Sequence, residues 1–208
     1  MILSALKTVR FWFDKRLLLL SFAALVVCLS RVPFAHAEEE RIARLTASVL
    51  DNNRVAVTAE LIRWTNRNIR DDLNNGIPKD LYYYILLKRR QPGWFDEEVV
   101  SKTIRQTIKY DVLKKEYSIT TRMDDQTTQK TVESFEEMAD LISRIDHVKI
   151  TSLKRMRPRY TYYISVKAEM RATNVPFYFE YILFFIPALE LDTPWADSAP
   201  FYALEESP

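Results

Sequence analysis

Few residues of this chain could carry catalytic chemistry. His147 is the only histidine beyond residue 37, Cys28 is the single cysteine, and neither a G-x-S-x-G nor an H-E-x-x-H sequence occurs. Gly76 and Gly93 are the two glycines, so no glycine-rich loop can surround a phosphate. A lone histidine without a paired nucleophile fits a surface position better than a catalytic one. We therefore predict no catalytic residues and no cofactor, and we expect the protein not to be an enzyme.

Adjacent acidic residues are the other candidates for acid–base or metal chemistry. They occur at positions 71–72, 96–98, 124–125 and 136–137. Neighbouring acids do not face each other, and none of these groups has the alternating oxygen ligands of a calcium loop. Starts of helices and solvated turns explain them better. An enzyme that uses paired carboxylates is thus the weakest hypothesis, and we predict no metal site.

A basic cluster is the first candidate binding surface. It consists of Lys149, Lys154, Arg155, Arg157 and Arg159, with Met156 and Tyr160 among them. These cations could contact phosphates or anionic headgroups, whereas the alternative is a solvated turn that offsets the acidic C-terminal region. Within this cluster, we predict that Arg155 and Arg157 bind a partner.

The second candidate is the most apolar run after the N-terminus, residues 177–186, in which Glu180 is the only charge. It is either a buried return strand or a docking face for a protein, a lipid or a bilayer surface. It is too short to span a bilayer, which takes about 20 residues. Glu180 must reach water or a cation and so brings part of the run to the surface. We predict partner contacts from Phe177, Phe179, Glu180 and Phe184.

The N-terminal 37 residues have the features of a secretory signal peptide. Basic residues precede the apolar residues 17–30, and Ala35-His36-Ala37 provides a small-x-small cleavage site. Cleavage would place a chain that begins at Glu38 in the periplasm, without a cysteine. The alternative is an uncleaved anchor in the inner membrane. Apart from the N-terminal segment, only residues 177–186 are expected to touch a membrane.

Charge gives no reason to expect nucleic acid as a partner. The N-terminal segment holds five of the 30 basic residues and one of the 28 acidic residues, which leaves 25 basic and 27 acidic residues. A mildly acidic chain does not attract a polyanion as a whole.

Alternating apolar residues predict most of the strands. They indicate one hairpin over residues 45–61, a second over 103–123 and a long strand at 160–171. Residues 81–87 are apolar or aromatic on both faces, which predicts a central strand covered on two sides, and Val148, Ile150 and Leu153 suggest a further strand without strict alternation. Helical spacing predicts two short helices, one capped by Thr65 and ended by Gly76, the other capped by Ser134 with Glu137. Residues 123–131 are polar and are expected to form a loop.

These elements predict a β-rich domain of the α+β class, namely an antiparallel β-sandwich-like domain with two short helices. Because 48% of the residues are hydrophobic and 28% charged, the chain has the composition of a globular protein. Neither an internal repeat nor a linker is evident, so residues 38–208 are expected to form a single domain.

Several short sequences in a fixed order resemble the bacterial domain-of-unknown-function family 4390. They are N-G-I-P at 75–78, K-R-R followed by W-F at 88–95, I-K-Y-D-V-L-K-K-E-Y at 108–117 and V-P-F-Y-F-E-Y-I-L-F-F at 175–185. The resemblance implies a small exported protein of Gram-negative bacteria whose gene lies near that of a membrane sensor histidine kinase. It brings no catalytic residues.

The leading hypothesis is therefore an exported, non-enzymatic interaction protein of the periplasm and cell envelope. Its partner would be an envelope or inner-membrane protein, with an accessory role to the sensor kinase as the finer hypothesis. The alternative is a carrier or sensor of an apolar small molecule or lipid, with aromatic residues lining a pocket between sheet and helix. Those aromatics are Tyr82 to Tyr84, Tyr160, Tyr162, Tyr163, Phe177 and Phe179.

Overall fold

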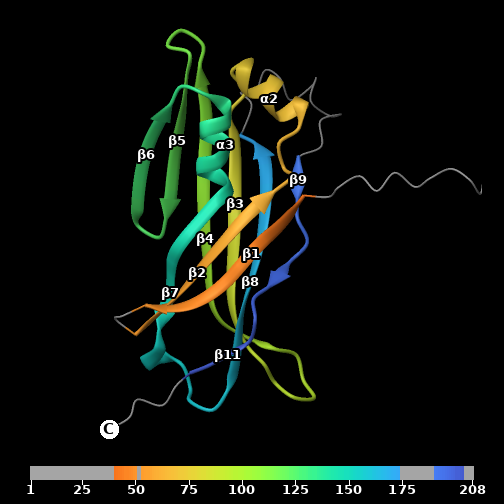
Figure 1. The fold of residues 1–208 in the computed structure, drawn as a ribbon, viewed down its shortest axis with the longest axis vertical. Helices are drawn as coiled ribbons and strands as arrows, with labels where there is room; N and C mark the ends of the chain where they lie inside the picture. The colour runs from red at the N-terminus through yellow and green to blue at the C-terminus, as the bar shows by residue number, and fades with distance from the viewer. Residues whose placement is uncertain (1–39, 51–52, 174–189, 204–208) are drawn as a thin grey trace, which may run out of the picture. The chain divides into compact units, whose positions relative to one another are not determined.

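Strands form two antiparallel sheets in the computed structural model, which describes residues 40–50, 53–173 and 190–203 (Figure 1). The smaller sheet has the order β1 (Arg41–Leu50), β2 (Arg54–Ile62), β7 (Arg144–Ser152). The long strands of the larger sheet have the order β8 (Thr161–Ala172), β3 (Lys79–Arg89), β4 (Glu97–Asp111), β5 (Glu116–Met123), β6 (Gln126–Val132). The predicted β-rich, sandwich-like fold is confirmed, as are both predicted hairpins.

Three two-residue strands complete the free edge of β8. They are β9 (Leu191–Asp192), β10 (Ala196–Asp197) and β11 (Phe201–Tyr202), and each pairs antiparallel with a different part of β8. Ser165 on β8 is fully buried and donates to Asp197 Oδ1 at 2.6 Å. The outer face of the long strand is therefore less open than its alternating sequence predicts.

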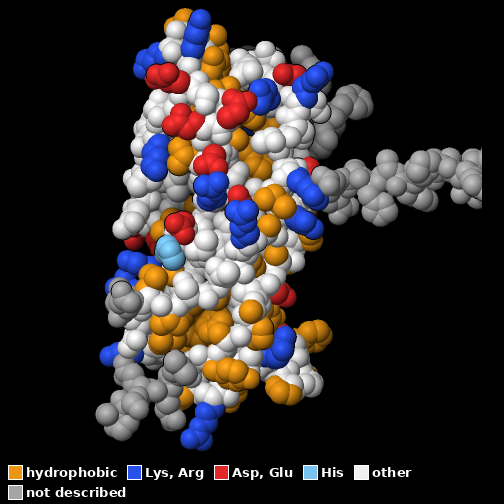
Figure 2. All heavy atoms as spheres, viewed as in Figure 1, with side chains coloured by type: hydrophobic (Ala, Val, Ile, Leu, Met, Phe, Trp, Pro, Cys, Tyr) orange, Lys and Arg blue, Asp and Glu red, His pale blue; other side chains and the backbone are white. Residues whose placement is uncertain are grey.

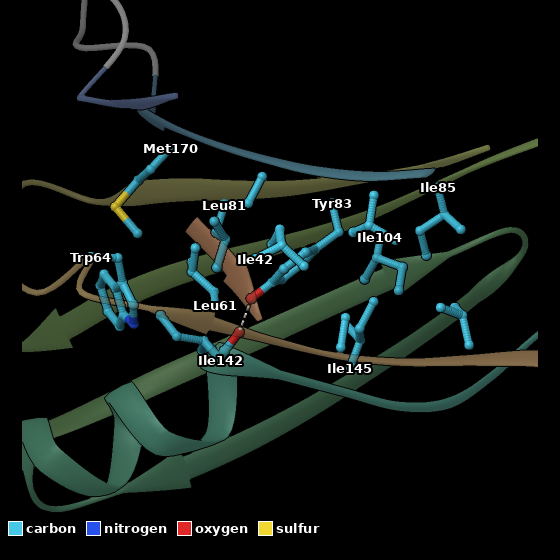
Figure 3. Packing of buried hydrophobic residues seen from close by; sticks show 14 of the residues in the cluster. Ile42, Leu61, Trp64, Leu81, Tyr83, Ile85, Ile104, Ile142, Ile145 and Met170 are labelled. Carbon is cyan, nitrogen blue, oxygen red and sulfur yellow. Dashed lines mark hydrogen bonds between the residues drawn. The ribbon is translucent and has the colours of Figure 1, made fainter. Parts of the chain in front are cut away.

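The central position predicted for β3 is confirmed, because β3 lies between β4 and β8. Leu81, Tyr83, Ile85 and Leu87 alternate along β3 and are fully buried. Figure 3 shows the first three packed in the core toward the smaller sheet and α3. The Tyr83 hydroxyl donates to the Ile142 carbonyl oxygen at 2.7 Å, which satisfies both polar groups inside the core. Burial raises the pKa of Tyr83.

Helix α2 (Arg67–Asn74) follows β2 and contacts β4. Its cap is Asn66, whose side chain accepts from the Ile69 amide at 2.8 Å, so the predicted cap Thr65 is wrong by one residue. Asparagine competes well with threonine at this position. Gly76, at φ +82°, ends the helix as predicted, and its amide donates to the Leu73 carbonyl.

Helix α3 (Phe135–Ser143) connects the two sheets between β6 and β7. The Ser134 side chain accepts from the Glu137 amide at 3.1 Å, which confirms the predicted cap. Met138 and Ile142 enter the common core with residues of both sheets (Figure 3). None of the helices within the described residues is both long and apolar enough to cross a membrane.

The predicted loop at residues 123–131 is wrong, because β6 pairs with β5 along its whole length. Asp124, at φ +52°, lies in the short turn between the two strands. β6 lies at an edge of the larger sheet, and its residues before Val132 are exposed. A strand with polar residues on both faces has no period-two signal, which explains the failed prediction.

Candidate functional site

Two connections meet at one end of the larger sheet. The β3–β4 loop (residues 90–96) follows β3, and a single 3₁₀ turn, η1 (Leu153–Arg155), leads through residues 156–160 into β8. Arg89 pairs with Tyr162 across the two strands, and the Arg90 amide donates to the Thr161 carbonyl at 2.9 Å. Both connections lie at the lower end of the view in Figure 1, near β11.

The β3–β4 loop exposes two large aromatic side chains. Trp94 is 77% exposed and Phe95 87%, and their rings touch edge-on with centroids 6.4 Å apart. Gly93, at φ +79°, supplies the backbone conformation that turns the chain into this pair. Figure 2 shows hydrophobic side chains gathered toward this end of the molecule, with basic side chains among them. Adjacent exposed aromatics are typical of a contact surface.

Asp96 fixes the loop in place. One carboxylate oxygen accepts from the Gln91 amide at 3.0 Å and the other accepts from the Tyr163 hydroxyl at 2.6 Å. The hydrogen bond from Tyr163 lowers the pKa of Asp96. Burial, together with the hydrogen bond to Asp96, raises the pKa of Tyr163 to about 12. At neutral pH the carboxylate is therefore ionised and the phenol protonated, which is the state that holds the loop against β8.

Basic residues lie against the aromatic rings beside this loop. Lys88 Nζ is 5.9 Å from the centre of the Tyr163 ring and 5.5 Å from that of Trp195. The Arg90 guanidinium lies 5.9 Å from the Tyr163 ring on the same face of the sheet. These distances allow cation–π attraction, which holds both cations near the surface of the sheet.

The second connection carries the predicted partner-binding residues Arg155 and Arg157. The Arg157 amide donates to the Tyr162 hydroxyl oxygen at 2.9 Å, and that hydroxyl donates to the Arg157 carbonyl at 3.2 Å. Among the described residues, no carboxylate forms an ion pair with either arginine side chain. Tyr160, 43% exposed, follows in the same connection and lies 4.7 Å from the Arg89 guanidinium.

We call this surface the aromatic–basic end. Its members are Lys88, Arg90, Trp94, Phe95, Arg155, Arg157 and Tyr160. The sequence predicted only the two arginines as binding residues. A sequence signal existed for the members on the β3–β4 side. Residues 88–95 contain three cations (K-R-R), a Pro-Gly turn and then Trp-Phe, so the turn places two aromatics beside the cations. The remaining predicted contacts, Phe177, Phe179, Glu180 and Phe184, lie outside the residues that the structure describes.

The tyrosines that were expected to line one apolar pocket do not share a face. Tyr83 and Tyr162 are packed in the core, whereas Tyr82 and Tyr84 stack on each other on the opposite face of β3, with centroids 6.1 Å apart. Alternation along the strand separates neighbouring side chains in this way. The three consecutive tyrosines therefore cannot form a single wall.

A cleft of about 380 Å³ lies beside α3, over β4 to β6, and most of its lining residues are polar. Gln106, Thr121, Thr128 and Lys130 line it from the sheet, and Arg144 from the start of β7. Arg144 pairs with Asp140 of α3 at 2.6 Å. Ile119 and Leu141 also line the cleft, so its lining is mixed and lacks the aromatic side chains of the carrier hypothesis.

His147 and the acidic pairs do not assemble into a site. His147 lies in β7 with its side chain 61% exposed, 3.6 Å from Asp146. Asp72 pairs with Lys79, and Asp124 pairs with Lys102. In the described part of the chain, no three histidine, cysteine or acidic side chains gather closely enough to bind a metal ion.

Comparison with known families agrees with the order of short sequences noted above. The family described as Domain of unknown function (DUF4390) matches residues 37–198. The chain belongs to this family. No curated protein and no solved structure matches the chain. The resemblance seen in the sequence is confirmed, and DUF4390 membership assigns no activity to any residue of the aromatic–basic end.

Proposed function

We propose that this DUF4390 protein is an exported, non-enzymatic interaction protein of the bacterial cell envelope and that it binds through the aromatic–basic end. The observation that carries the proposal is the exposure of Trp94 and Phe95 on a loop that Asp96 holds in place. A contact surface that is ordered before binding loses less conformational entropy on binding. Aromatic and arginine side chains also dominate the energetics of many interfaces.

Sequence and resemblance support the location and the class of partner. Residues 1–37 have the pattern of an export signal, which favours the periplasm over an inner-membrane anchor. The partner we propose is an envelope or inner-membrane component, and the sensor histidine kinase implied by the resemblance is the finer hypothesis. The non-enzymatic role rests on the lack of a paired nucleophile and base in the sequence.

Fractionation of cells tests this proposal. The chain is exported behind an efficiently cleaved signal so that it begins at Glu38, and its distribution between membranes and soluble periplasm is measured. We expect Trp94→Ala with Phe95→Ala to lower the bound-to-free ratio by about 10-fold or more, because the exposed aromatics supply most of the contact energy.

Leu113→Ala is the matched control for this experiment. Leu113 is 94% exposed in the turn at the other end of β4, so the substitution removes a similarly exposed apolar side chain away from the proposed surface. It should leave the distribution unchanged. A wild-type chain that is wholly soluble, or a double variant that is retained as well as the Leu113 variant, would rule out binding through this end.

A further inference from the structure

We infer that the partner of the aromatic–basic end is the headgroup layer of an anionic lipid bilayer. This inference rests on the proposed function and names the chemistry of the surface that is bound. Four features of the described residues support it: exposed aromatics on a projecting loop, cations at the same end, an excess of these cations over the acids there, and hydrogen-bonded backbone amides in the loop.

The tip of the β3–β4 loop suits insertion into a headgroup layer. Trp94 and Phe95 are adjacent and more than three-quarters exposed, and the loop projects past the ends of the strands (Figure 1). Tryptophan favours the membrane–water interface, because its ring is apolar while its N–H needs a polar partner. A fluid layer can close around a convex tip, whereas a protein partner would need a matching pocket.

Cations lie at the same end as the tip, and two of the three acids there, Asp96 and Glu97, are already engaged, while Glu98 is exposed across the strands from Lys88. Lys88 and Arg90 lie over aromatic rings, and Arg155 and Arg157 extend from the neighbouring connection. Asp96 accepts from Tyr163 and Gln91, as described above. Glu97 pairs with Arg89 and accepts from the Gln91 side-chain amide at 2.9 Å. The five cations Lys88, Arg89, Arg90, Arg155 and Arg157 outnumber the three acids Asp96, Glu97 and Glu98, so this end keeps a net positive charge that attracts anionic headgroups.

Backbone pairing lowers the penalty for moving this loop out of bulk water. The amides of Arg90, Gln91 and Trp94 donate to Thr161, Asp96 and Gln91 respectively. An unpaired amide is costly to place near hydrocarbon, and these three are already satisfied inside the protein. These three hydrogen bonds need not break when the loop approaches the lipid.

The turn between β4 and β5 provides an internal comparison. It exposes Val112 and Leu113 next to Lys114 and Lys115, but it has no aromatic residue. The Asp111 carboxylate accepts from two amides of this turn, so the turn is ordered as well. If an ordered, exposed apolar tip beside lysines were sufficient, both ends of β4 would bind lipid equally. Our inference predicts that only the aromatic–basic end does.

Vesicle binding tests the inference with the exported protein as purified from cells. The probes are vesicles of phosphatidylcholine alone and of phosphatidylcholine mixed with phosphatidylglycerol, and the readout is co-sedimentation. We expect binding to the anionic vesicles to weaken as salt is added, because salt screens the attraction. Trp94→Ala with Phe95→Ala should reduce this binding by about 10-fold or more, since both rings lose their burial in lipid.

Two further variants complete the experiment. Leu113→Ala should bind as the wild type does. Arg155→Glu with Arg157→Glu should reduce binding to the anionic vesicles and leave any weak binding to neutral vesicles unchanged. All variants carry the same N-terminal sequence, so differences between them report the substitutions alone. Their unfolding transitions should match that of the wild type, because all the substituted side chains are on the surface.

Each outcome separates this inference from the proposed function. The lipid inference is wrong if the wild type does not bind anionic vesicles or binds both vesicle types equally. It is also wrong if the Trp94→Ala, Phe95→Ala variant binds anionic vesicles as well as the wild type does. If retention in cell fractionation nevertheless depends on Trp94 and Phe95, the bound component is a protein and the proposed function stands. If retention is also independent of Trp94 and Phe95, both the lipid inference and the proposed function are wrong.

Discussion

Lys79→Ala is expected to lower the free energy of unfolding by about 3–5 kcal/mol, because it leaves a buried carboxylate without its cation. The Lys79 side chain is fully buried, and Nζ lies 2.6 Å from Asp72 Oδ2 and 2.5 Å from Glu190 Oε1. The Glu190 side chain is only 12% exposed, and its other oxygen already has no hydrogen-bond partner among the described residues. Removal of the lysine leaves both acids without the group that neutralises them.

Chemical denaturation of two variants tests this expectation. The control is Lys114→Ala, which removes a lysine whose side chain is 70% exposed from its pair with Glu116. An exposed pair contributes about 0–1 kcal/mol, so the control should unfold close to the wild type. If Lys79→Ala destabilises the protein no more than Lys114→Ala, the buried ion pairs of Lys79 do not stabilise the fold as proposed.

Ile108→Asp is expected to destabilise the fold by about 3–5 kcal/mol or to prevent folding, because it places an unpaired charge in the core. Ile108 is fully buried on the inner face of β4, where it pairs with Lys79 of β3 and Ile119 of β5. The cation across the strands from Ile108 is Lys79, which already binds Asp72 and Glu190.

The neighbouring residue supplies the control. Lys109 is exposed on the opposite face of the same strand, so Lys109→Asp should change the free energy of unfolding by no more than about 0.5 kcal/mol. Thermal or chemical unfolding of the two variants measures the contrast. If both substitutions lower the free energy of unfolding by similar amounts, the assignment of Ile108 to the buried face and Lys109 to the exposed face of β4 is wrong.

Strands with a period of two, or with a continuous apolar run, could be predicted from the sequence. β4, β5 and β8 alternate, β3 is apolar or aromatic on both faces, and all four were found. β7 was expected to begin near residue 148, but it begins at Arg144, and its pairing with β2 shifts register twice. Such irregularities break the alternation, which explains why Ile145 and Ile150, five residues apart, are both buried.

The candidate site could be predicted only in part, because its geometry depends on contacts between distant residues. The sequence placed Arg155 and Arg157 in a basic cluster, and their role in binding stays a prediction. The Tyr163 hydroxyl that holds Asp96 is 67 positions away in the chain, and no local pattern indicates this pairing. The burial of Lys79 could not be predicted from the sequence either, since a lysine at the start of a strand is usually exposed.

Site-specific photo-crosslinking in growing cells tests the central claim most directly. A photoreactive amino acid replaces Phe95 in one variant and Leu113 in another, at exposed tips on opposite ends of β4. The account predicts adducts with an envelope component, lipid or protein, from position 95 and none above background from position 113. Equal adducts from both positions, or none from position 95, would contradict it.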